Sequence, residues 1–333
     1  MKYRQTAAAG LLLALMLCGC AAGQAKAEFY AMDTVMQITA CGAGAQEAVH
    51  AAQTEVYRLE SLFSCREAGA ELARCNAGQT ALSAETAELI GRALELSAQT
   101  DGAYDPTLGA LTAAWGFDDG NYRVPDAAQR AEALRCCGTD KVSLTENAAV
   151  LSVSGGVQLD LGGIGKGCAA AHVRQILLDG GVRSAIVSLG GNVCAVGAKP
   201  DGTDWTIGLQ DPREPSSYFA TVAVRDAAVV TSGGYQRYFE QDGVRYHHIL
   251  DGKTGAPAES GLLSVSVVCT DDTLADALST ALYVMGLEKG IAFWRAGGAD
   301  FEAVWMTEDG SVWLTSGLCD AYRSQTPYQV VER

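Results

Sequence analysis

The chain has 333 residues, of which 48% are apolar and 19% are charged, as is typical of a globular protein with a substantial core. Its 39 Asp and Glu outnumber its 24 Lys and Arg, giving a net charge of −15. This balance argues against nucleic acid as a partner, because neutralising phosphates requires a basic face. It is compatible with a cationic or metal-bridged ligand.

The N-terminus has the layout of a secretory signal peptide. Lys2 and Arg4 precede an apolar run at residues 7–17, and a basic start followed by a short apolar core is typical of such signals. The run is too short for a membrane-spanning helix, which requires about 20 residues. We therefore expect residues 1–19 to be removed on export.

Cys20 follows Leu17-Cys18-Gly19, an arrangement that resembles a lipoprotein signal. We expect Cys20 to carry lipid and residues 20–27 to form a tether. Several acyl chains bind a membrane far more firmly than one does. The protein would then be exported and anchored at the periplasmic or outer face of the cell membrane. Plain secretory cleavage near Ala22, without lipid, is the alternative.

The first half of the chain predicts one strand followed by several helices. Residues 28–41 alternate partly and read as a strand, and residues 45–63 have helical apolar spacing. Ser83 is a suitable N-cap for a helix over residues 84–98. A short helix should end at Trp115, and Pro125 should open another that ends near residue 135. Strands are predicted at 141–145, 149–154 and 153–161.

The second half predicts strands that alternate with turns, and a helical pair near the end. A helix is expected at 168–178, and two more at 273–285 and 288–296. Asp242-Gly243 is a strong hairpin turn. The expected strands are residues 183–189, 205–210, 218–225, 228–231, 235–240, 244–250, 264–270, 301–306 and 311–315. This mixture favours an α+β fold with mixed, largely antiparallel sheets and packed helices, in one domain over residues 28–330.

A glycine-rich stretch at residues 159–167 reads Leu-Asp-Leu-Gly-Gly-Ile-Gly-Lys-Gly. Asp160 lies near its start, and Lys166 lies near the beginning of the predicted helix. Glycines let a backbone approach a ligand closely, and helix N-termini attract anions, so we consider a phosphate-bearing ligand. The stretch does not match the strict P-loop or dinucleotide-binding patterns. A simple tight turn is the alternative.

Asp272, Asp276 and Thr280 are spaced i, i+4 and i+8, so they share one face of the predicted helix. Acidic and hydroxyl oxygens on the flank of an apolar helix suggest a site for a hard cation such as Mg²⁺. A solvated helix edge, whose N-terminal acid favours the helix dipole, is the alternative.

His247 and His248 are adjacent in a predicted strand, so their side chains should face opposite ways. Only one of them can face a given site. That histidine is either a hydrogen-bonded core residue or a general base. The eleven cysteines show no CxxC spacing in the mature region, and we expect most of them to be small buried apolar residues.

An ordered series of short motifs resembles the ApbE family, whose members are FAD:protein FMN transferases with a T-fold-like architecture. The series covers nearly all of the mature chain, which makes it far more specific than any one motif. In chain order the motifs are Met32-x-Thr34, residues 102–107 (GAYDPT), 115–117 (WGF), 160–167 (DLGGIGKG), 188–192 (SLGGN), 231–238 (TSGxYxRY), 248–251 (HILD) with 254–255 (TG), and 275–280 (ADALST).

The resemblance implies an activity and a set of site residues. It implies Mg²⁺-dependent transfer of FMN from FAD to a threonine of a partner protein, with release of AMP. Acceptor proteins of the family include subunits of Rnf- and Nqr-type redox complexes. By the resemblance, His248 and Asp276 are catalytic, and Gly163 (through its carbonyl), Asp276 and Thr280 bind the metal. The implied FAD contacts are Met32, Ala103, Tyr104, Asp105, Asp160, Lys166 and Leu250.

Two positions depart from the family pattern. Asp33 replaces the usual glycine after the methionine, and Gly252 replaces the usual proline after the HILD segment. Asp33 adds a negative charge, and Gly252 loosens a turn that proline would stiffen. Three other functions remain open: an FAD pyrophosphatase, an FAD-binding lipoprotein without catalysis, and a generic exported solute-binding lipoprotein.

Overall fold

The computed structural model describes residues 23–145 and 150–333. The expected signal peptide, the lipidated Cys20 and the alternative cleavage site at Ala22 lie outside these residues. Within the described part of the chain, no helix is long and apolar enough to cross a membrane.

Seven α-helices are described, and the longest is interrupted. Gly286 in α7 has φ +76° and ψ 178°, so the helix breaks there into the two pieces that the sequence predicted. The helices are α1 (Ala45–Phe63), α2 (Glu71–Asn76), α3 (Ala84–Gln99), α4 (Gly109–Trp115), α5 (Ala127–Arg135), α6 (Gly165–Asp179) and α7 (Asp272–Ala296).

Nine strands form one large sheet in the order β1-β2-β5-β6-β9-β14-β15-β16-β18. Every neighbouring pair is antiparallel except β16 and β18, which are parallel. Its strands are β1 (Gln24–Ala31), β2 (Thr34–Cys41), β5 (Ser184–Leu189), β6 (Asn192–Gly197), β9 (Ala228–Gly233), β14 (Leu262–Cys269), β15 (Glu302–Thr307), β16 (Val312–Thr315) and β18 (Tyr328–Val331).

The other strands form small sheets. β7 (Trp205–Gln210), β8 (Tyr218–Val224) and β17 (Tyr322–Ser324) make a sheet of three, in the order β17-β8-β7. The remaining pairs are β3 (Val142–Thr145) with β4 (Val150–Val153), β10 (Tyr238–Gln241) with β11 (Val244–His247), and β12 (Leu250–Asp251) with β13 (Ala256–Pro257).

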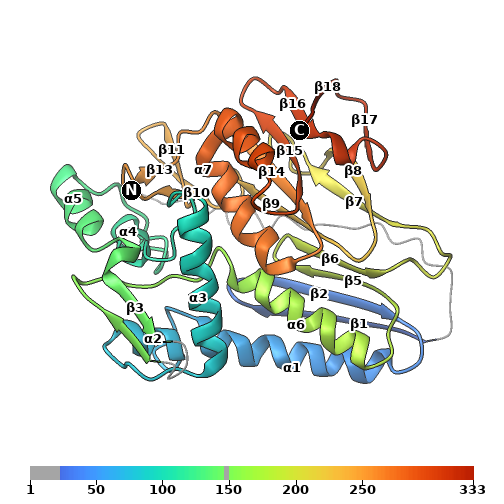
Figure 1. Cartoon of the computed structure of the whole chain (residues 1–333), viewed down its shortest axis with the longest axis horizontal. Coiled ribbons are helices and arrows are strands. Elements are labelled where there is room, and N and C mark those ends of the chain that lie inside the picture. The colour runs from blue at the N-terminus through green and yellow to red at the C-terminus, as the bar shows by residue number, and fades with distance from the viewer. Residues whose placement is uncertain (1–22, 146–149) are drawn as a thin grey trace.

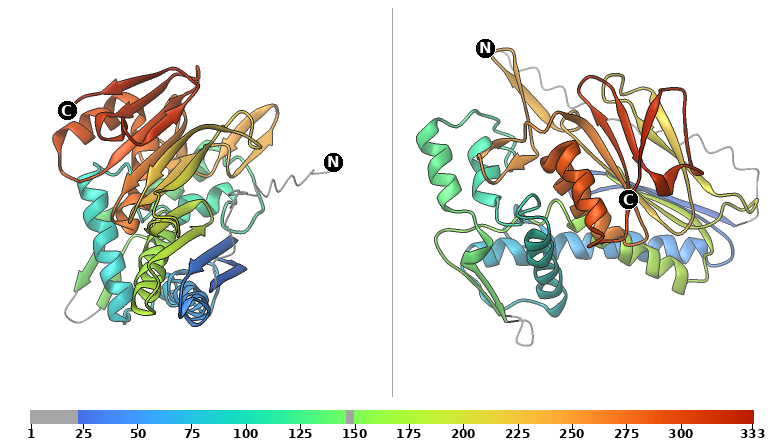
Figure 2. Two further views of the ribbon diagram at one scale, coloured as in Figure 1. Left: turned by 90° about the vertical axis from the view of Figure 1, so that its right-hand side faces the viewer. Right: turned by 45° about the horizontal axis from the view of Figure 1, so that its top comes forward.

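The large sheet has a hydrophobic core on each face. Successive side chains of a strand point to opposite faces, so neighbouring residues of one strand join different cores. Val187 of β5 joins the core beneath α1 and α6, whereas its neighbour Ile186 joins the core shared with β7 and β8. Figures 1 and 2 show α1, α6 and α7 beside the sheet and the β3–β4, α2, α4 and α5 segments gathered at one end. The helix α6 therefore begins where this end of the molecule meets the sheet.

The N-terminal strand prediction was wrong in an instructive way. Residues 28–41 form part of a hairpin of two strands, with the turn at Met32 and Asp33, where φ is +48° and +61°. Such a left-handed pair is the backbone of a tight two-residue hairpin turn, which the sequence signals only when Asn or Gly is present. Residues 24–27, expected in the tether, belong to β1 instead.

Other differences concern short elements. The strand expected at residues 149–154 is β4, but the one expected at 153–161 is not formed, so the glycine-rich stretch is entered from a loop. The strand β6 and the helix α2 were not predicted, and β17 and β18 follow the segment that was expected to close the chain. Helices α1 and α3 have the predicted bounds within one residue, and Ser83 caps α3 by accepting the Thr86 N–H.

Candidate active site

The buried carboxylate of Asp276 lies where helices α6 and α7 cross. Its side chain is about 5% exposed. Its Oδ2 accepts the backbone N–H of Gly167 at 2.8 Å, and its Oδ1 lies 3.9 Å from the Lys166 ammonium. A carboxylate at a helix N-terminus is stabilised by the unpaired N–H groups there. The start of α6 thus binds an anion, as the sequence suggested, but this anion is the protein's own.

Gly167 allows the two helices to approach this closely. A Cβ atom added to it would lie 2.4 Å from the Asp272 carbonyl oxygen and 2.7 Å from Asp276 Cβ. Both distances are too short for any side chain, so only glycine fits here. The glycine therefore fixes the distance between Lys166 on α6 and Asp276 on α7.

Gly163 lies between Tyr104 and Thr280. A Cβ at this position would be 3.2 Å from Tyr104 Cε2 and 3.4 Å from Thr280 Oγ1. Thr280 is one turn beyond Asp276 on α7. The structure thus brings together the three predicted metal-binding residues, Gly163, Asp276 and Thr280, from a loop and a helix 113 to 117 positions apart.

Two more acids approach from the loops. Asp160 accepts the Gly162 N–H at 2.8 Å and the Thr112 hydroxyl at 3.4 Å, and its own N–H donates to the Pro106 carbonyl at 2.8 Å. Asp105 accepts both the N–H and the hydroxyl of Thr107. These bonds hold each carboxylate in one orientation.

Tyr104 lies among these acids. Its side chain is buried, and its hydroxyl has no hydrogen-bond partner among the described residues. Burial, followed by the charges of Asp276, Asp160 and Asp105, raises the pKa of this phenol well above 10. The hydroxyl is therefore protonated and remains a potential donor.

Lys166 is the cation that faces these acids. Its ammonium donates to the Gly162 carbonyl at 3.0 Å, which holds it over the glycine-rich stretch. Asp276 lies 3.9 Å from this lysine, and Asp105, Asp160 and Asp276 all act on the neighbouring Tyr104, so three carboxylates and one lysine share this region. The surplus negative charge favours a bound cation, because like charges gathered at a half-buried site repel one another.

His248 is held as a neutral imidazole. Its Nδ1 donates to the Arg237 carbonyl at 3.1 Å, since a carbonyl can only accept. Burial, and then the charge of Arg237, lowers the pKa of His248 to about 3, and Lys166 contributes in the same direction. Its Nε2 is therefore the unprotonated nitrogen. His247 instead stacks edge-on against Tyr283 and bonds to the Ala258 carbonyl, so the two histidines have different surroundings, as predicted.

The remaining predicted FAD contacts lie around this centre. Ala103 is half-buried beside Tyr104 in the turn after α3. Leu250 is buried in an aromatic cluster with Trp115 and Phe117, whose ring lies 6.4 Å from that of His248. Met32 lies farther out: its N–H donates to Glu60, and its neighbour Asp33 pairs with Arg66. Met32 packs against the core cluster that includes Tyr104 and Leu161.

Asp272 does not belong to the site, although the helical spacing grouped it with Asp276. It is also buried, and it forms a bidentate ion pair with Arg174 at 2.9 and 3.1 Å. The prediction of one shared cation face is therefore wrong for Asp272. The spacing could not distinguish Asp272 from Asp276, because the two acids differ only in the α6 group that each contacts. Asp272 pairs with the Arg174 guanidinium, whereas Asp276 accepts the Gly167 N–H.

Some residues of the site were not assigned a role from sequence. The guanidinium groups of Arg66 and Arg237 both donate to the Phe117 carbonyl. Ser279 donates to the carbonyl of Asp276, and its hydroxyl is 2.8 Å from that of Ser232. Both Arg237 and Ser279 fall inside the quoted motifs, which was the available signal.

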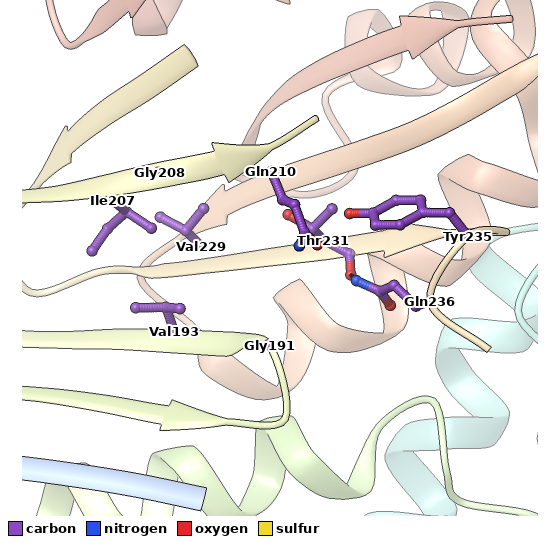
Figure 3. A pocket seen from close by; sticks show the side chains of 9 residues that line it. All are labelled: Gly191, Val193, Ile207, Gly208, Gln210, Val229, Thr231, Tyr235 and Gln236. Carbon is purple, nitrogen blue, oxygen red and sulfur yellow. Dashed lines mark hydrogen bonds between the residues drawn. The ribbon is translucent and has the colours of Figure 1, made fainter. Parts of the chain in front are cut away.

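One cavity lies beside the glycine-rich stretch, and another lies between the sheets. One of about 390 Å³ adjoins Asp160 and is lined by Cys65, Arg66, Asn76, Gly109, Thr112, Asp118, Asp119, Gln158, Leu159 and Asp160. The other, between β6, β7 and β9, has a volume of only about 20 Å³ (Figure 3). That volume suffices for a water molecule and not for a nucleotide.

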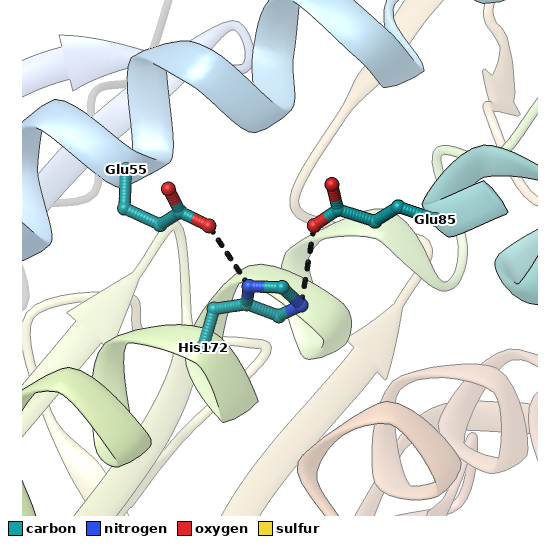
Figure 4. A group of neighbouring side chains, drawn as sticks. All are labelled: Glu55, Glu85 and His172. Carbon is teal, nitrogen blue, oxygen red and sulfur yellow. Dashed lines mark hydrogen bonds and ion pairs between the residues drawn. The ribbon is translucent and has the colours of Figure 1, made fainter. Parts of the chain in front are cut away.

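A second polar cluster joins helices α1, α3 and α6. The two ring nitrogens of His172 face different carboxylates, Glu55 at 2.9 Å and Glu85 at 3.6 Å (Figure 4). Arg58 also bonds to both acids. The three side chains could also offer one ligand atom each to an ion, but Arg58 already bonds to both carboxylates. The cluster is therefore an ion-pair network that ties three helices together.

The described cysteines behave as small apolar residues, as expected. None of the nine within the described residues forms a disulfide, and only Cys319 is exposed. Burial raises the pKa of the Cys65 and Cys168 thiols to about 12, so they are poor nucleophiles.

Comparison with known proteins gives one consistent answer. The model of the ApbE family matches residues 32–305. A protein from Treponema pallidum (strain Nichols), named FAD:protein FMN transferase, is 35% identical over 97% of both chains. A protein of the same name from Klebsiella pneumoniae (strain 342) is 35% identical over 78% of this chain and 82% of its own.

Solved structures agree with the sequence relatives. The ApbE protein from Thermotoga maritima has a TM-score of 0.85 at 34% identity, covering 90% of this chain and 100% of its own. The flavin transferase ApbE from Vibrio cholerae has a TM-score of 0.80 at 27% identity, covering 90% of this chain and 99% of its own. The mixed α+β fold is therefore the fold of these proteins.

Proposed function

The chain belongs to the ApbE family, and from this premise we propose that it uses a divalent cation to transfer FMN from FAD to a threonine hydroxyl of a partner protein. The enzyme is a flavin transferase with FAD as its substrate. The cation, the threonine acceptor and the roles of individual residues are our proposal.

The observation that carries the proposal is the convergence of acids around the contact between Gly163, Tyr104 and Thr280. Asp276 is buried next to Thr280 and faces Lys166, and Asp160 and Asp105 add two more charges. Carboxylate, hydroxyl and carbonyl oxygens suit Mg²⁺, which usually keeps several waters and bridges to phosphates. The residues present therefore fit such an ion. Asp276, Thr280 and the carbonyl of Gly163 would hold it.

When bound, Mg²⁺ would neutralise the FAD pyrophosphate and stabilise the charge that develops as the phosphoanhydride breaks. Lys166 supplies a fixed positive charge at the same place. Met32, Ala103, Tyr104, Asp105, Asp160, Lys166 and Leu250 would contact FAD. Of these residues, Asp160 lines the cavity of about 390 Å³.

His248 is suited to take the proton of the acceptor hydroxyl. Its N–H bond to the Arg237 carbonyl leaves Nε2 with a free lone pair. The threonine oxygen would bond to the FMN phosphorus while the bond to the AMP phosphate breaks, and AMP would keep that electron pair. A pKa near 3 makes His248 a weak base in the free protein. A bound pyrophosphate would raise this pKa, because nearby negative charge favours the imidazolium.

The two departures from the family pattern leave this arrangement intact. Asp33 pairs with Arg66, so its charge is balanced by that guanidinium. Its φ of +61° is a conformation that the usual glycine adopts without strain and that Asp tolerates. A Cβ atom added to Gly252 would lie 3.2 Å from Leu108 Cδ2 and 3.6 Å from Asp105 Oδ2. This turn therefore lies at the edge of the site.

We also propose that the enzyme acts at a membrane surface. The motif around Cys20 supports lipidation after export, and acceptor proteins such as subunits of Rnf- and Nqr-type complexes would lie in the same membrane. Labelling cells with a fatty-acid probe would test this, with Cys20→Ala expected to abolish the label. Label that persists on the variant would contradict the anchor.

The catalytic proposal is tested by incubating the full chain with FAD, Mg²⁺ and a partner fragment that contains an acceptor threonine. Fluorescent flavin that remains on the denatured partner, together with AMP release, is the expected result. Replacing the acceptor threonine by alanine should abolish the label. Release of FMN without labelling would indicate a pyrophosphatase, and unchanged FAD would indicate storage. Both outcomes would contradict transfer.

A further inference from the structure

The Tyr104 hydroxyl is a donor that no described residue uses. It is buried and unpartnered, although three carboxylates are near enough to raise its pKa. A buried hydroxyl without a partner costs about 1–3 kcal/mol. Such a group is expected where a ligand completes the hydrogen bond.

The ring that carries this hydroxyl is fixed from both sides. The Tyr104 N–H donates to the Thr100 hydroxyl at 3.2 Å, and that hydroxyl donates to the Leu96 carbonyl at 2.7 Å, so the residue is tied to the end of α3. Its Cε2 edge packs against Gly163, which also contacts Thr280. The phenol ring therefore lies beside Gly163, one of the residues expected to hold the cation, with Thr280 close by on the same glycine.

We propose that Tyr104 is a positioning residue of the cation site, whose hydroxyl donates a hydrogen bond to an oxygen atom bound to the divalent ion. This inference rests on the proposed function, because it requires the cation at Asp276 and Thr280. The oxygen belongs either to a water on the ion or to a phosphate of the nucleotide. Both are acceptors of the same kind, polarised by the ion and rich in negative charge.

The geometry agrees with this role. The phenol is buried and unpartnered beside Gly163, and its O–H can donate to an anionic oxygen. Hydrogen bonds to charged acceptors are about twice as strong as neutral ones. The bond would therefore orient the metal-bound oxygen while Asp276 and Thr280 hold the ion.

The test compares Tyr104→Phe with wild type in the full chain, since this change removes only the hydroxyl. Titration calorimetry would measure the affinity for Mg²⁺ alone and for Mg²⁺ in the presence of ADP. We expect an affinity about tenfold lower, the size of one charged hydrogen bond. A loss with Mg²⁺ alone identifies a water as the acceptor, and a loss only with ADP identifies a phosphate.

Thermal unfolding without ligand separates this role from a structural one. Removing an unpartnered hydroxyl should leave the Tm unchanged or raise it. The control is Tyr322→Phe: this side chain is also buried, but it lies in the sheet of β7, β8 and β17, where its hydroxyl faces Ser324. The control should leave both affinities unchanged.

Three results would overturn the inference. If wild type binds Mg²⁺ and Tyr104→Phe binds it equally well in both titrations, the Tyr104 role fails and the cation site stands. If wild type binds no Mg²⁺ with or without ADP, the cation site and the Tyr104 role fail together. If Tyr104→Phe lowers the Tm and leaves both Mg²⁺ affinities unchanged, Tyr104 has only a structural role, and the inference also fails.

Discussion

Asp276 and Asp272 are two buried acids one helical turn apart on α7, and we predict that their amide variants fail in opposite ways. Asp276→Asn should lose the cation and catalysis while the protein stays folded. Asp272→Asn should lose stability while cation affinity is kept. The two substitutions are chemically identical, and the two side chains are similarly buried.

The magnitude for Asp276→Asn follows from its contacts. The amide oxygen can still accept the Gly167 N–H. The attraction to Lys166 is lost, but a buried charge is removed at the same time, so the free energy of unfolding should change by about 1 kcal/mol or less. Changing an outer-shell partner of a metal costs about 10–100-fold in affinity, so loss of a direct ligand should cost more than about 100-fold. The transfer rate should fall by at least about 100-fold, in line with other electrostatic contributions to catalysis.

For Asp272→Asn, the loss falls on Arg174. Its side chain is 15% exposed and would be left without its carboxylate. Breaking a buried pair costs about 3–5 kcal/mol, and the partial exposure of Arg174 reduces this to roughly 2–4 kcal/mol. Each kcal/mol lowers the Tm of a chain of this size by about 2–4 °C at most. A decrease of roughly 4 °C, and about 16 °C at most, is therefore expected.

The assay combines thermal unfolding, Mg²⁺ titration by calorimetry and in-gel flavin fluorescence of an acceptor fragment. The reasoning would be refuted if Asp276→Asn bound Mg²⁺ and transferred FMN like wild type. It would also be refuted if Asp272→Asn lost Mg²⁺ affinity at a temperature where it is fully folded.

Three further predictions follow from single contacts. Gly167→Ala should lower the free energy of unfolding by several kcal/mol, because the added methyl group would lie 2.4 Å from the Asp272 carbonyl oxygen. A Tm within 2–3 °C of wild type would correspond to a loss of only about 1 kcal/mol and would contradict the close contact between α6 and α7. The pKa of His248 is lowered from 6.5 to about 3, so a plot of kcat/KM against pH should show no inflection near pH 6.5. Between pH 6.5 and 3 the unfolded state binds a proton at this histidine and the folded state does not, so the free energy of unfolding should fall as the pH drops through this range. The fall should be less steep in His248→Gln, which has no imidazole to protonate. Asp33→Gly should change stability by less than about 1 kcal/mol, because relief of the left-handed backbone offsets the lost exposed pair with Arg66; a larger loss in urea unfolding would show that the pair matters more.

Much of the local structure could be predicted. The bounds of α1, the Ser83 cap of α3 and the break in α7 at Gly286 follow from apolar spacing, a capping hydroxyl and a glycine. Helical hydrogen bonds join residues four apart, so the relevant information is contiguous. The ordered motifs also predicted the family and named Gly163, Asp276 and Thr280, which the structure brings into one place.

The sequence alone did not determine the pairing of segments or the partner of each side chain. The hairpin at Met32 is local, but its turn lacks the Asn or Gly that usually marks one. The pairing of β6 with β9 and the parallel addition of β18 to β16 join segments that are separated in the chain. The same holds for charge: Asp272 and Asp276 have identical helical signals, yet one meets Arg174 and the other meets the start of α6. Only the tertiary structure decides this, because a buried acid's role is set by the groups that surround it and not by its own spacing.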